Sequence, residues 1–451
     1  DRICDSAIMQ LLIISISTLI FFSQEIFAQE VLSKENSIKD LSSAIYSWQE
    51  CIEIAAQNNN NLKSAIAAER STYFQSNAAA SGFLPQASAT LSSNRGTGGN
   101  ASNPSITTVQ GNITQAYSGS VSLTQNLFSG FLDVGKFDQA KANNMVAKAN
   151  ITIAKAQVSY DLKAAYQNFY YAKESVKLLD SIIKRRQDNL HIIELRFKSG
   201  MENKGSLLLA QAYLEQAKFN RLQGANLIET ARAQLCKALG ISDCKNYDIS
   251  DSVPTKAPKI LNSLDFKNIL EKTPQHLQAI AQEQAAKAGI LIAQSTFMPS
   301  LNLTGTKGQR GSNFFPQNDY WSVGMNLTFP FFTGGKDYYT TRSAYASSSA
   351  AKENRENIDQ QILVNLKQSY NSYIEAVAKL KVDANFKEAT QLRAEIARNK
   401  YNNGLLIFEN WDAIETDLIN RQTTYLQSVL NRVTSEAAWE QAQGQGVFNN
   451  D

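Results

Sequence analysis

Proline and glycine are nearly missing from two long parts of this sequence. All eight prolines lie outside residues 105–253 and 331–451. Between Phe131 and Ser199 the single glycine is Gly135, and between Lys336 and Asn403 there is none. Because these residues are the strongest helix breakers, and both parts are rich in good helix formers, each predicts one helix of about 65 residues. Such a helix is roughly 100 Å long, too long for an ordinary globular domain to bury, so it must pack along other helices.

The sequence also contains few histidines and cysteines, and its net charge is small. His191 and His276 are the only histidines, and the four cysteines fit no zinc motif. A formal net charge of +3 over 451 residues gives no reason to expect a nucleic-acid partner. No phosphate-binding glycine loop, nucleophile elbow or zinc-protease motif occurs. The sequence therefore predicts no enzyme activity and no cofactor or metal.

Long hydrophobic runs are absent after the N-terminus, which argues against a transmembrane helix in the mature chain. The predominantly apolar run at 11–22 is too short to span a membrane comfortably and precedes the small residue Ala28. This pattern is typical of a secretory signal, predicted over residues 1–28. A buried N-terminal hairpin strand is the alternative.

The cysteines leave one question open. Cys4 would be removed with the signal, and Cys51 is predicted to pack as a small apolar residue. Cys236 and Cys244 could form a disulfide in an oxidising compartment. They could equally remain two unpaired thiols.

The sequence contains two similar halves. Phe128-Ser129-Gly130 corresponds to Phe332-Thr333-Gly334, and Arg196–Gly200 corresponds to Lys400–Gly404, at the same offset of 204 residues. Upstream, Leu84-Pro85 corresponds to Met298-Pro299 at an offset of 214. We therefore expect two structural repeats, over residues 29–254 and 255–451. The extra ten residues in the first repeat are expected in a loop.

Before each predicted long helix the hydrophobic period changes to two. Val121, Leu123 and Leu127 alternate with serine, threonine and asparagine, and the same holds from Trp321 to Phe331. Strict alternation predicts half-buried strands. The strand pairs are expected at about 85–128 and 299–332, with loops at 95–111 and 307–319. A soluble β-layer is the alternative to strands in a membrane.

Each repeat is then predicted as helix, strand pair, long helix and return helix. The first helices are expected at 62–83 and 277–297, the long helices at about 131–198 and 336–402, and the return helices at about 206–239 and 408–441. Gly200 and Gly404 are the predicted caps at the turns. The cluster Lys184-Arg185-Arg186 is interpreted as a solvated helix face.

Four strands with one apolar face cannot close a membrane barrel, because open strand edges are not viable in lipid. Three copies would supply 12 strands, although counting alone does not exclude two or four. The predicted fold is mostly α with a small β part and an internal two-fold repeat. Long helical hairpins would form an α-barrel joined to a trimeric 12-stranded transmembrane β-barrel with four strands per chain.

With these features the chain resembles the outer-membrane efflux proteins, the TolC-like channels. The resemblance covers about residues 41–443. It rests on the opening segment Trp48–Asn59, the two helix-to-strand prolines, the two FSG/FTG junctions and the two basic-aromatic-x-x-Gly turns. It implies a homotrimeric conduit in the outer membrane that contacts lipid and extends into the periplasm. It also implies a periplasmic adaptor (membrane fusion) protein and an inner-membrane pump of the RND or ABC type.

The resemblance also assigns site residues by position. Those expected at the adaptor-contacting tips are Arg196, Phe197, Gly200, Met201, Lys400, Tyr401, Gly404 and Leu405. The candidates for an acidic entrance gate are Glu409, Asp412 and Glu415, while Asn410 stands where the family pattern has an acid. A ring of carboxylates at a constriction would favour cations.

The predicted function is a passive export duct of a tripartite efflux or secretion system. The cargo and the pump's energy source stay open. The alternatives are a non-conducting, envelope-spanning structural or adhesive trimeric rod and a soluble helical interaction protein.

Overall fold

Residues 45–97, 113–242, 247–255 and 264–448 are described by the structure, a computed structural model. The predicted signal segment lies outside these residues. The chain divides into a smaller unit, Asp1–Tyr46 with Lys245–Asp248, and a larger unit, Ser47–Cys244 with Ile249–Asp451. In the smaller unit the rings of Tyr46 and Tyr247 stack with their centroids 4.7 Å apart. The short strands β1 (Ile45–Tyr46) and β4 (Asp248–Ile249) pair with each other. The other described helices and strands belong to the larger unit.

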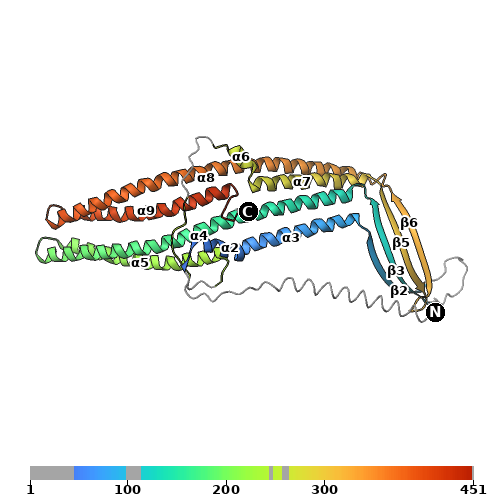
Figure 1. Cartoon of the computed structure of the whole chain (residues 1–451), viewed down its shortest axis with the longest axis horizontal. Helices are drawn as coiled ribbons and strands as arrows, with labels where there is room; N and C mark the ends of the chain where they lie inside the picture. Colours follow the sequence, from blue (N-terminus) through green and yellow to red (C-terminus); the bar gives the residue numbers. More distant parts are fainter. Residues whose placement is uncertain (1–44, 98–112, 243–246, 256–263, 449–451) are drawn as a thin grey trace. The chain divides into compact units, whose positions relative to one another are not determined.

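Two very long helices dominate the larger unit. Helices α4 (Leu132–Lys198) and α8 (Lys336–Asn402) each contain 67 residues. Each turns back into a shorter helix, α5 (Lys204–Leu239) after α4 and α9 (Phe408–Ala442) after α8. The helices of each hairpin pack on each other, and α9 also packs on α4 (Figure 1). The two hairpins therefore support one another along their length.

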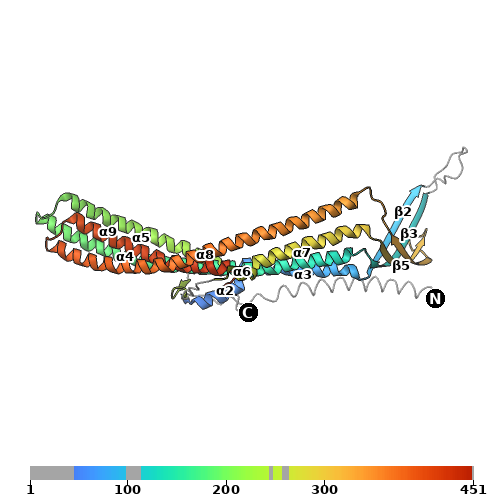
Figure 2. The same cartoon turned by 90° about the horizontal axis from the view of Figure 1, so that it is seen from above.

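Shorter helices cover the remaining length of the long ones. Helix α3 (Asn60–Ala80), with the 3-10 turn η1 (Ser81–Phe83), packs on α4. Helix α7 (Pro274–Gln294), with η2 (Ser295–Phe297), packs on both α4 and α8. Thus α5 and α9 accompany one part of the long helices, and α3 and α7 accompany the other (Figure 2). Two small helices complete the unit, α2 (Trp48–Asn58) and α6 (Phe266–Glu271).

Glycines permit the short helices to meet end to end. Gly240 follows α5 with a left-handed φ of 75°, and a Cβ there would lie 2.3 Å from the carbonyl oxygen of Asn58. Asn59, which caps α3, also donates from its amide to the carbonyl of Ala238 at 2.8 Å. In the second half, a Cβ on Gly444 would lie 2.1 Å from the Pro274 ring. Contacts this close, with backbone at Gly240 and with a rigid proline ring at Gly444, exclude a side chain at either position.

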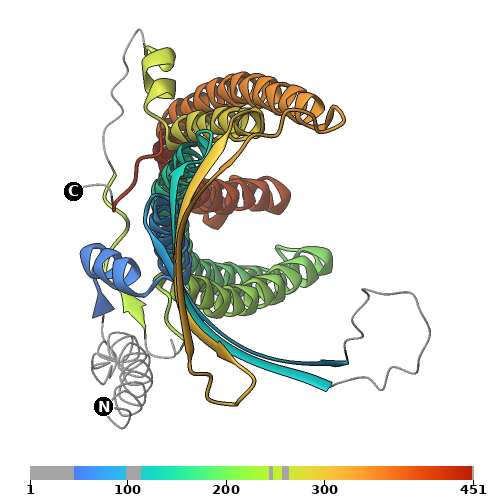
Figure 3. The same ribbon diagram turned by 90° about the vertical axis from the view of Figure 1, so that its right-hand side faces the viewer.

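Four strands form one antiparallel sheet in the order β2-β3-β5-β6 (Figure 3). Their bounds are β2 (Gln86–Thr97), β3 (Ile113–Phe128), β5 (Ser300–Gly311) and β6 (Asn318–Thr328). The loop predicted over residues 307–319 is wrong in extent, because β5 continues to Gly311 and β6 already begins at Asn318. Strand β2 likewise passes Arg95. Polar side chains interrupt the alternation at these strand ends, while backbone pairing continues past them.

The pairing register separates apolar from hydroxyl side chains onto opposite faces of the sheet. Leu123 lies opposite Ala87 on one side and Gly305 on the other. The large apolar residues of this face are strongly exposed: Leu91 86%, Val121 58%, Trp321 77%, Val323 68%, Met325 66% and Leu327 66%. On the other face hydroxyls bond across strands, Ser92 with Ser118 at 2.8 Å and Ser122 with Thr306 at 3.1 Å. We call these the apolar face and the hydroxyl face.

Among the described residues, every helix is too short or too polar to cross a membrane. The strands β2 and β6 are the two edges of the sheet, each paired along one side within the chain. The sheet therefore carries both an uncovered apolar face and two open edges.

The two described cysteines are buried. Cys51 is fully buried, and desolvation raises the pKa of its thiol to about 12, so it is unreactive at neutral pH. Cys236, at the end of α5, is disulfide-bonded. Its predicted partner, Cys244, lies outside the described residues, so the pairing of these two residues stays a prediction.

The glycine contacts generate a first prediction. Gly240→Ala should destabilise the protein by about 3 kcal/mol or more, because a left-handed φ and a backbone clash are added together. Gly200→Ala is the matched control, with a φ of 74° but nothing within 4 Å of its Cβ. It should cost only about 1–2 kcal/mol. Thermal or denaturant unfolding in detergent measures both; equal losses would contradict the end-to-end contact.

Candidate functional site at the helical tips

Both hairpins end in the same turn, built around a glycine. Gly200 and Gly404 have φ values of 74° and 73°. The amide of Met201 donates to the carbonyl of Arg196 at 2.8 Å, and that of Leu405 donates to Lys400 at 2.9 Å. These bonds close the helices in the Schellman geometry, which needs a left-handed residue and therefore favours glycine. The following residues are pushed outward, so Met201 is 65% and Leu405 74% exposed.

A buried aromatic cluster lies just behind these turns. Tyr401 and Trp411 stack with centroids 4.2 Å apart and an interplanar angle of 15°. Both rings are almost completely buried and pack with Phe408, Ile193 and Ala210. Residues of all four hairpin helices thus meet in one core. We call this set the tip cluster.

Polar contacts attach the second hairpin to the first through Tyr401. Arg196 Nη1 donates to the Tyr401 carbonyl at 2.9 Å, and its guanidinium lies 4.7 Å from the centre of the Tyr401 ring. The Tyr401 hydroxyl donates to Glu202 Oε2 at 2.8 Å. Burial, followed by this bond to Glu202, raises the pKa of Tyr401 well above its usual range. The phenol therefore stays protonated and available as a donor.

Two ion pairs join α4 to α9, farther from the turns than the Tyr401–Trp411 stack. Arg186 Nη1 donates to Asp412 Oδ1 at 2.8 Å and Nη2 donates to Thr416 Oγ1 at 3.1 Å. Arg185 holds Glu415 through two bonds, one from Nε and one from Nη2, the latter 3.0 Å long. Glu415 is only 1% exposed. Its hydrogen bond is the main cause that raises the pKa of Arg185. We call these two ion pairs the latch.

The latch corrects the sequence interpretation of Lys184-Arg185-Arg186 as a solvated face. Only Lys184 is exposed. Arg186 is buried, with its guanidinium 4.5 Å from the centre of the Tyr213 ring as well as on Asp412. Burial of these charges is tolerated because each has an opposite charge and hydrogen-bond partners.

The predicted tip residues separate into two groups. Phe197, Gly200, Met201, Lys400, Gly404 and Leu405 are exposed, and Arg196 is partly exposed. Tyr401 is fully buried, so the surface contact predicted for it is wrong. Its ring serves the tip cluster instead, because the aromatic face is covered by Trp411 and Arg196.

The three gate candidates are not equivalent. Glu409 is exposed, and with Asp412 it lines an open cavity of about 500 Å³ between α5 and α9. Asp412 and Glu415 are members of the latch, and their carboxylates already face arginines. Of the three, only Glu409 offers a carboxylate directed to solvent.

Sequence reasoning missed several important residues here. Trp411, Glu202 and Tyr213 were not candidates, and both arginines were assigned to solvent. The only local signal was Trp411 itself, since a large aromatic residue within a return helix indicates burial. The latch joins positions about 230 residues apart, so nothing local in the sequence reveals it.

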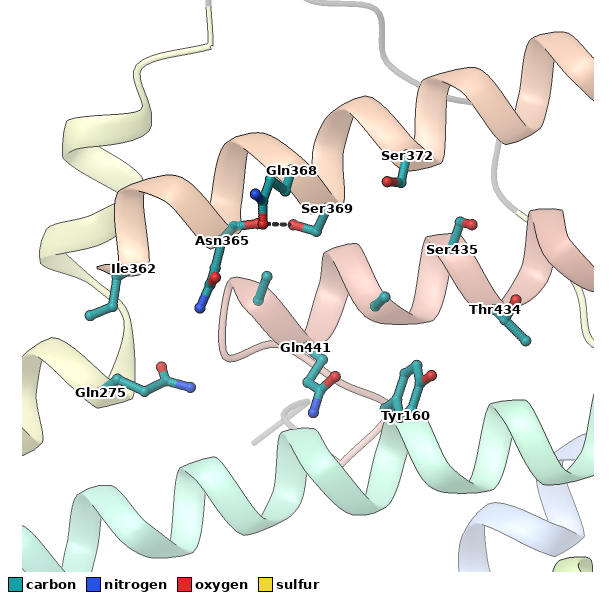
Figure 4. A pocket seen from close by; sticks show the side chains of 12 residues that line it. Tyr160, Gln275, Ile362, Asn365, Gln368, Ser369, Ser372, Thr434, Ser435 and Gln441 are labelled. Atoms are coloured by element: carbon teal, nitrogen blue, oxygen red, sulfur yellow. Dashed lines mark hydrogen bonds between the residues drawn. The ribbon is translucent and has the colours of Figure 1, made fainter. Parts of the chain in front are cut away.

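A second cavity, of about 570 Å³, lies where α8, α9, α4 and α7 meet (Figure 4). Its polar lining consists of Gln275, Asn365, Gln368, Ser369, Ser372, Thr434, Ser435, Gln441 and Tyr160. Ser369 already donates to the carbonyl of Asn365 at 2.8 Å. Amide and hydroxyl groups thus dominate the polar part of this lining.

The two histidines differ in their surroundings: His191 is exposed on α4, whereas His276 makes a structural contact. His276 is buried, and its Nδ1 lies 2.6 Å from Asp359. Within the part of the chain that the structure describes, no group of three or more His, Cys, Asp or Glu residues could hold a metal ion.

Comparison with known proteins agrees with this architecture. A family profile described as "Outer membrane efflux protein" matches residues 51–241 and 266–445. The "Probable outer membrane lipoprotein SilC" of Salmonella typhimurium is 22% identical over 284 residues, covering 61% of each chain. The chain thus spans less than two thirds of that relative's length.

Solved channel structures share the fold. The Campylobacter jejuni CmeC outer membrane channel gives a TM-score of 0.79 at 18% identity, covering 93% of this chain and 92% of that one. The open-state Neisseria gonorrhoeae MtrE outer membrane channel gives 0.73 at 19% identity, covering 92% and 95%. At such identities the likeness concerns the fold alone.

The tip cluster generates a second prediction. Tyr401→Ala should remove the stacked ring, its contact with the Arg196 guanidinium and the bond to Glu202, weakening the tip by about 3–5 kcal/mol. Tyr401→Phe keeps the ring and loses the bond to Glu202, which should cost about 1 kcal/mol. Hydrogen exchange of backbone amides near 190–200 and 408–415 should rise strongly in the first variant and slightly in the second. Unchanged exchange in Tyr401→Ala would show that the cluster does not hold the tip.

Proposed function

Because the chain belongs to the outer membrane efflux protein family, we propose that it is the passive export duct of a tripartite efflux or secretion system. The family comprises outer-membrane channels rather than enzymes, and the chain is accordingly an outer-membrane protein. One observation carries the proposal of a duct. A sheet with an uncovered apolar face and a hydroxyl face continues directly into 67-residue helices.

Closure of the sheet calls for further copies of the chain. The edges β2 and β6 cannot stay open in lipid, since their free amides and carbonyls would have no partner. Pairing β6 of one copy with β2 of the next satisfies both edges, and three copies give a 12-stranded barrel. The apolar face would then meet lipid, and the hydroxyl face would line a wet lumen.

The helices also offer surfaces for neighbouring copies. Large apolar side chains remain exposed on α8, namely Val364, Val382, Phe386, Leu392 and Ile396. Others remain exposed on α3 and α5, namely Ile66, Tyr73, Phe74, Phe219 and Leu222. Rods of this length require such contacts along their sides. In the proposed trimer these surfaces pack together, so that the hairpins form an α-barrel below the β-barrel.

The same reasoning accounts for the proposed two-repeat organisation. Each repeat, residues 29–254 and 255–451, contributes a strand pair and a hairpin. Three chains would therefore present six similar units around one axis. Because α4 and α8 have the same length, the turns of all six hairpins would lie at the same distance from the barrel.

The latch would keep the entrance of this duct narrow. It ties the α8–α9 hairpin to the α4–α5 hairpin of the same chain through buried charges. Separating the hairpins would leave Glu415 and Arg186 without their ion-pair partners. We infer that the described arrangement is a closed one and that the entrance opens when the latch separates. Glu409, exposed beside it, is the remaining candidate for an acidic ring at the entrance.

The exposed turns are the proposed docking points for partners. Phe197, Met201, Lys400 and Leu405 project from the ends of the hairpins, where a periplasmic adaptor protein would contact them. An inner-membrane pump of the RND or ABC type would supply the energy. A non-conducting rod is less well supported, since it gives no reason for a separate hydroxyl face on the sheet.

A third prediction tests the duct itself. The purified protein should migrate as a trimer in detergent, by light scattering or native mass spectrometry. Inserted into a planar lipid bilayer, it should produce single-channel current, because three sheets enclose a wet lumen. A trimer that inserts but never conducts would favour the structural rod. A monomer would contradict the barrel altogether.

A fourth prediction concerns the latch. The double variant Arg185→Gln, Arg186→Gln leaves buried carboxylates unpaired, which should destabilise the closed arrangement by about 3–5 kcal/mol. Single-channel conductance should therefore rise several-fold. Lys184→Gln, which removes the neighbouring exposed charge, is the matched control and should leave conductance unchanged.

The variant Glu409→Gln completes this experiment, because it distinguishes the effect of the acidic ring from the effect of the latch. It should lower the preference for cations without raising conductance as the double variant does. If the double variant and Lys184→Gln conduct alike, the latch does not control the entrance.

A further inference from the structure

The sheet region contains very few charges, and the pairing register assigns each to a face. Residues 86–128 and 300–332 include only Arg95, Lys307, Arg310 and Asp319 as charged residues. Lys307 lies opposite Val121 and Trp321 and so belongs to the apolar face. Asp319 lies opposite Gln309 on that same face and accepts a bond from its amide at 2.8 Å. Arg95 lies on the same face as Leu91, because side chains an even number of positions apart in a strand point to the same side of the sheet.

Arg310 alone lies on the hydroxyl face. It is opposite Ser118, which is in turn opposite Ser92, and these two serines are hydrogen-bonded to each other. On its other side Arg310 is opposite Asn318. Its guanidinium lies 5.6 Å from the centre of the ring of Tyr320, a residue of the same face, which is within cation–π distance. The side chain is exposed, and among the described residues no carboxylate forms an ion pair with it.

Arg310 lies at the end of the sheet farthest from the helices. Strand β5 begins at Ser300, directly after η2, and ends at Gly311. Figure 1 shows that the strands leave the helices at one end and turn at the other. Only Gly311 separates Arg310 from that turn. In an outer-membrane barrel this end opens to the outside of the cell.

We propose that Arg310 forms a threefold ring of positive charge at the outer mouth of the lumen and is the residue that selects there for anionic solutes. The inference rests on the proposed trimeric duct. Carboxylate, phosphate or sulfate groups on a solute are the chemistry that the ring would bind transiently. The remaining lumen wall formed by the strands is uncharged.

The dimensions of the barrel make such a ring effective. Twelve strands about 4.8 Å apart and tilted about 40° give a backbone radius of about 12 Å. Arginine side chains extend inward from that wall, so three guanidinium groups lie within about one Debye length, 8 Å at physiological ionic strength, of the axis. Water fills the lumen, yet the low-dielectric wall concentrates the field along it. The ring would thus oppose in sign the acidic Glu409 at the inner end of the same duct.

Ion selectivity in a planar bilayer tests the proposal. Reversal potentials are measured in a potassium chloride gradient at low ionic strength, for the trimer and for Arg310→Gln. The ratio of potassium to chloride permeability should rise by about two- to fivefold in the variant, and the difference should fade toward 1 M salt. Block of the current by sulfated cyclodextrin added on the outer side should weaken by about tenfold.

Lys307→Gln is the matched control, because it removes the same charge three residues away on the lipid-facing side. It should change neither the permeability ratio nor the block. Arg310→Lys keeps the charge and should behave like the unchanged chain, which separates charge from any folding defect.

The proposal is overturned if current flows and Arg310→Gln matches the unchanged chain, or if Lys307→Gln shifts selectivity equally. Trimers that pass no current at all would contradict the duct rather than the role of Arg310 alone.

Discussion

The unsatisfied sheet is the constraint on which the rest of this structure depends. Four strands expose an apolar face and end in two open edges, β2 and β6. Water would penalise the face and lipid would penalise the edges, so a lone chain is unstable in either solvent. Only edge-to-edge pairing with further copies relieves both. The proposed oligomer is therefore an arrangement that satisfies both the apolar face and the backbone of the sheet edges.

In the proposed oligomer the helices would continue that closure away from the membrane. Each long helix leaves the sheet within a few residues of a strand, through Gly130 or through Gly334 and Gly335, which have positive φ. Small buried residues on α4, such as Ala142, Ala149 and Ala156, let neighbouring helices approach closely. The end-to-end contacts at Gly240 and Gly444 let two short helices act as one second rod. A closed ring of strands can thus be continued by a closed ring of helices.

The sequence predicted the elements well because each depends on local physics. The missing prolines gave long helices at about 131–198 and 336–402, and the structure has α4 at 132–198 and α8 at 336–402. The alternation of apolar and polar residues predicted the strands. The loop predicted at 307–319 was too long, because Lys307 and Arg310 interrupt the alternation although strand β5 continues past them. The site was harder to predict. Tyr401 looked like a surface residue of a helix end, and its burial depends on Trp411 and Arg196, which other helices bring to it.

Buried charge at the tips decides how the proposed duct must work. Each latch carboxylate has its arginine, so separation leaves buried charges that cost about 3–5 kcal/mol per broken pair. Across the three copies of the proposed trimer this cost far exceeds thermal energy. A partner can shift the equilibrium only by binding the open arrangement more tightly than the closed one. Shifting a two-state equilibrium from almost entirely closed to almost entirely open takes a difference in binding free energy of about 5.5 kcal/mol between the two states. The exposed turns at Met201 and Leu405 are where we expect a partner to gain it, since their side chains are uncovered in the described arrangement.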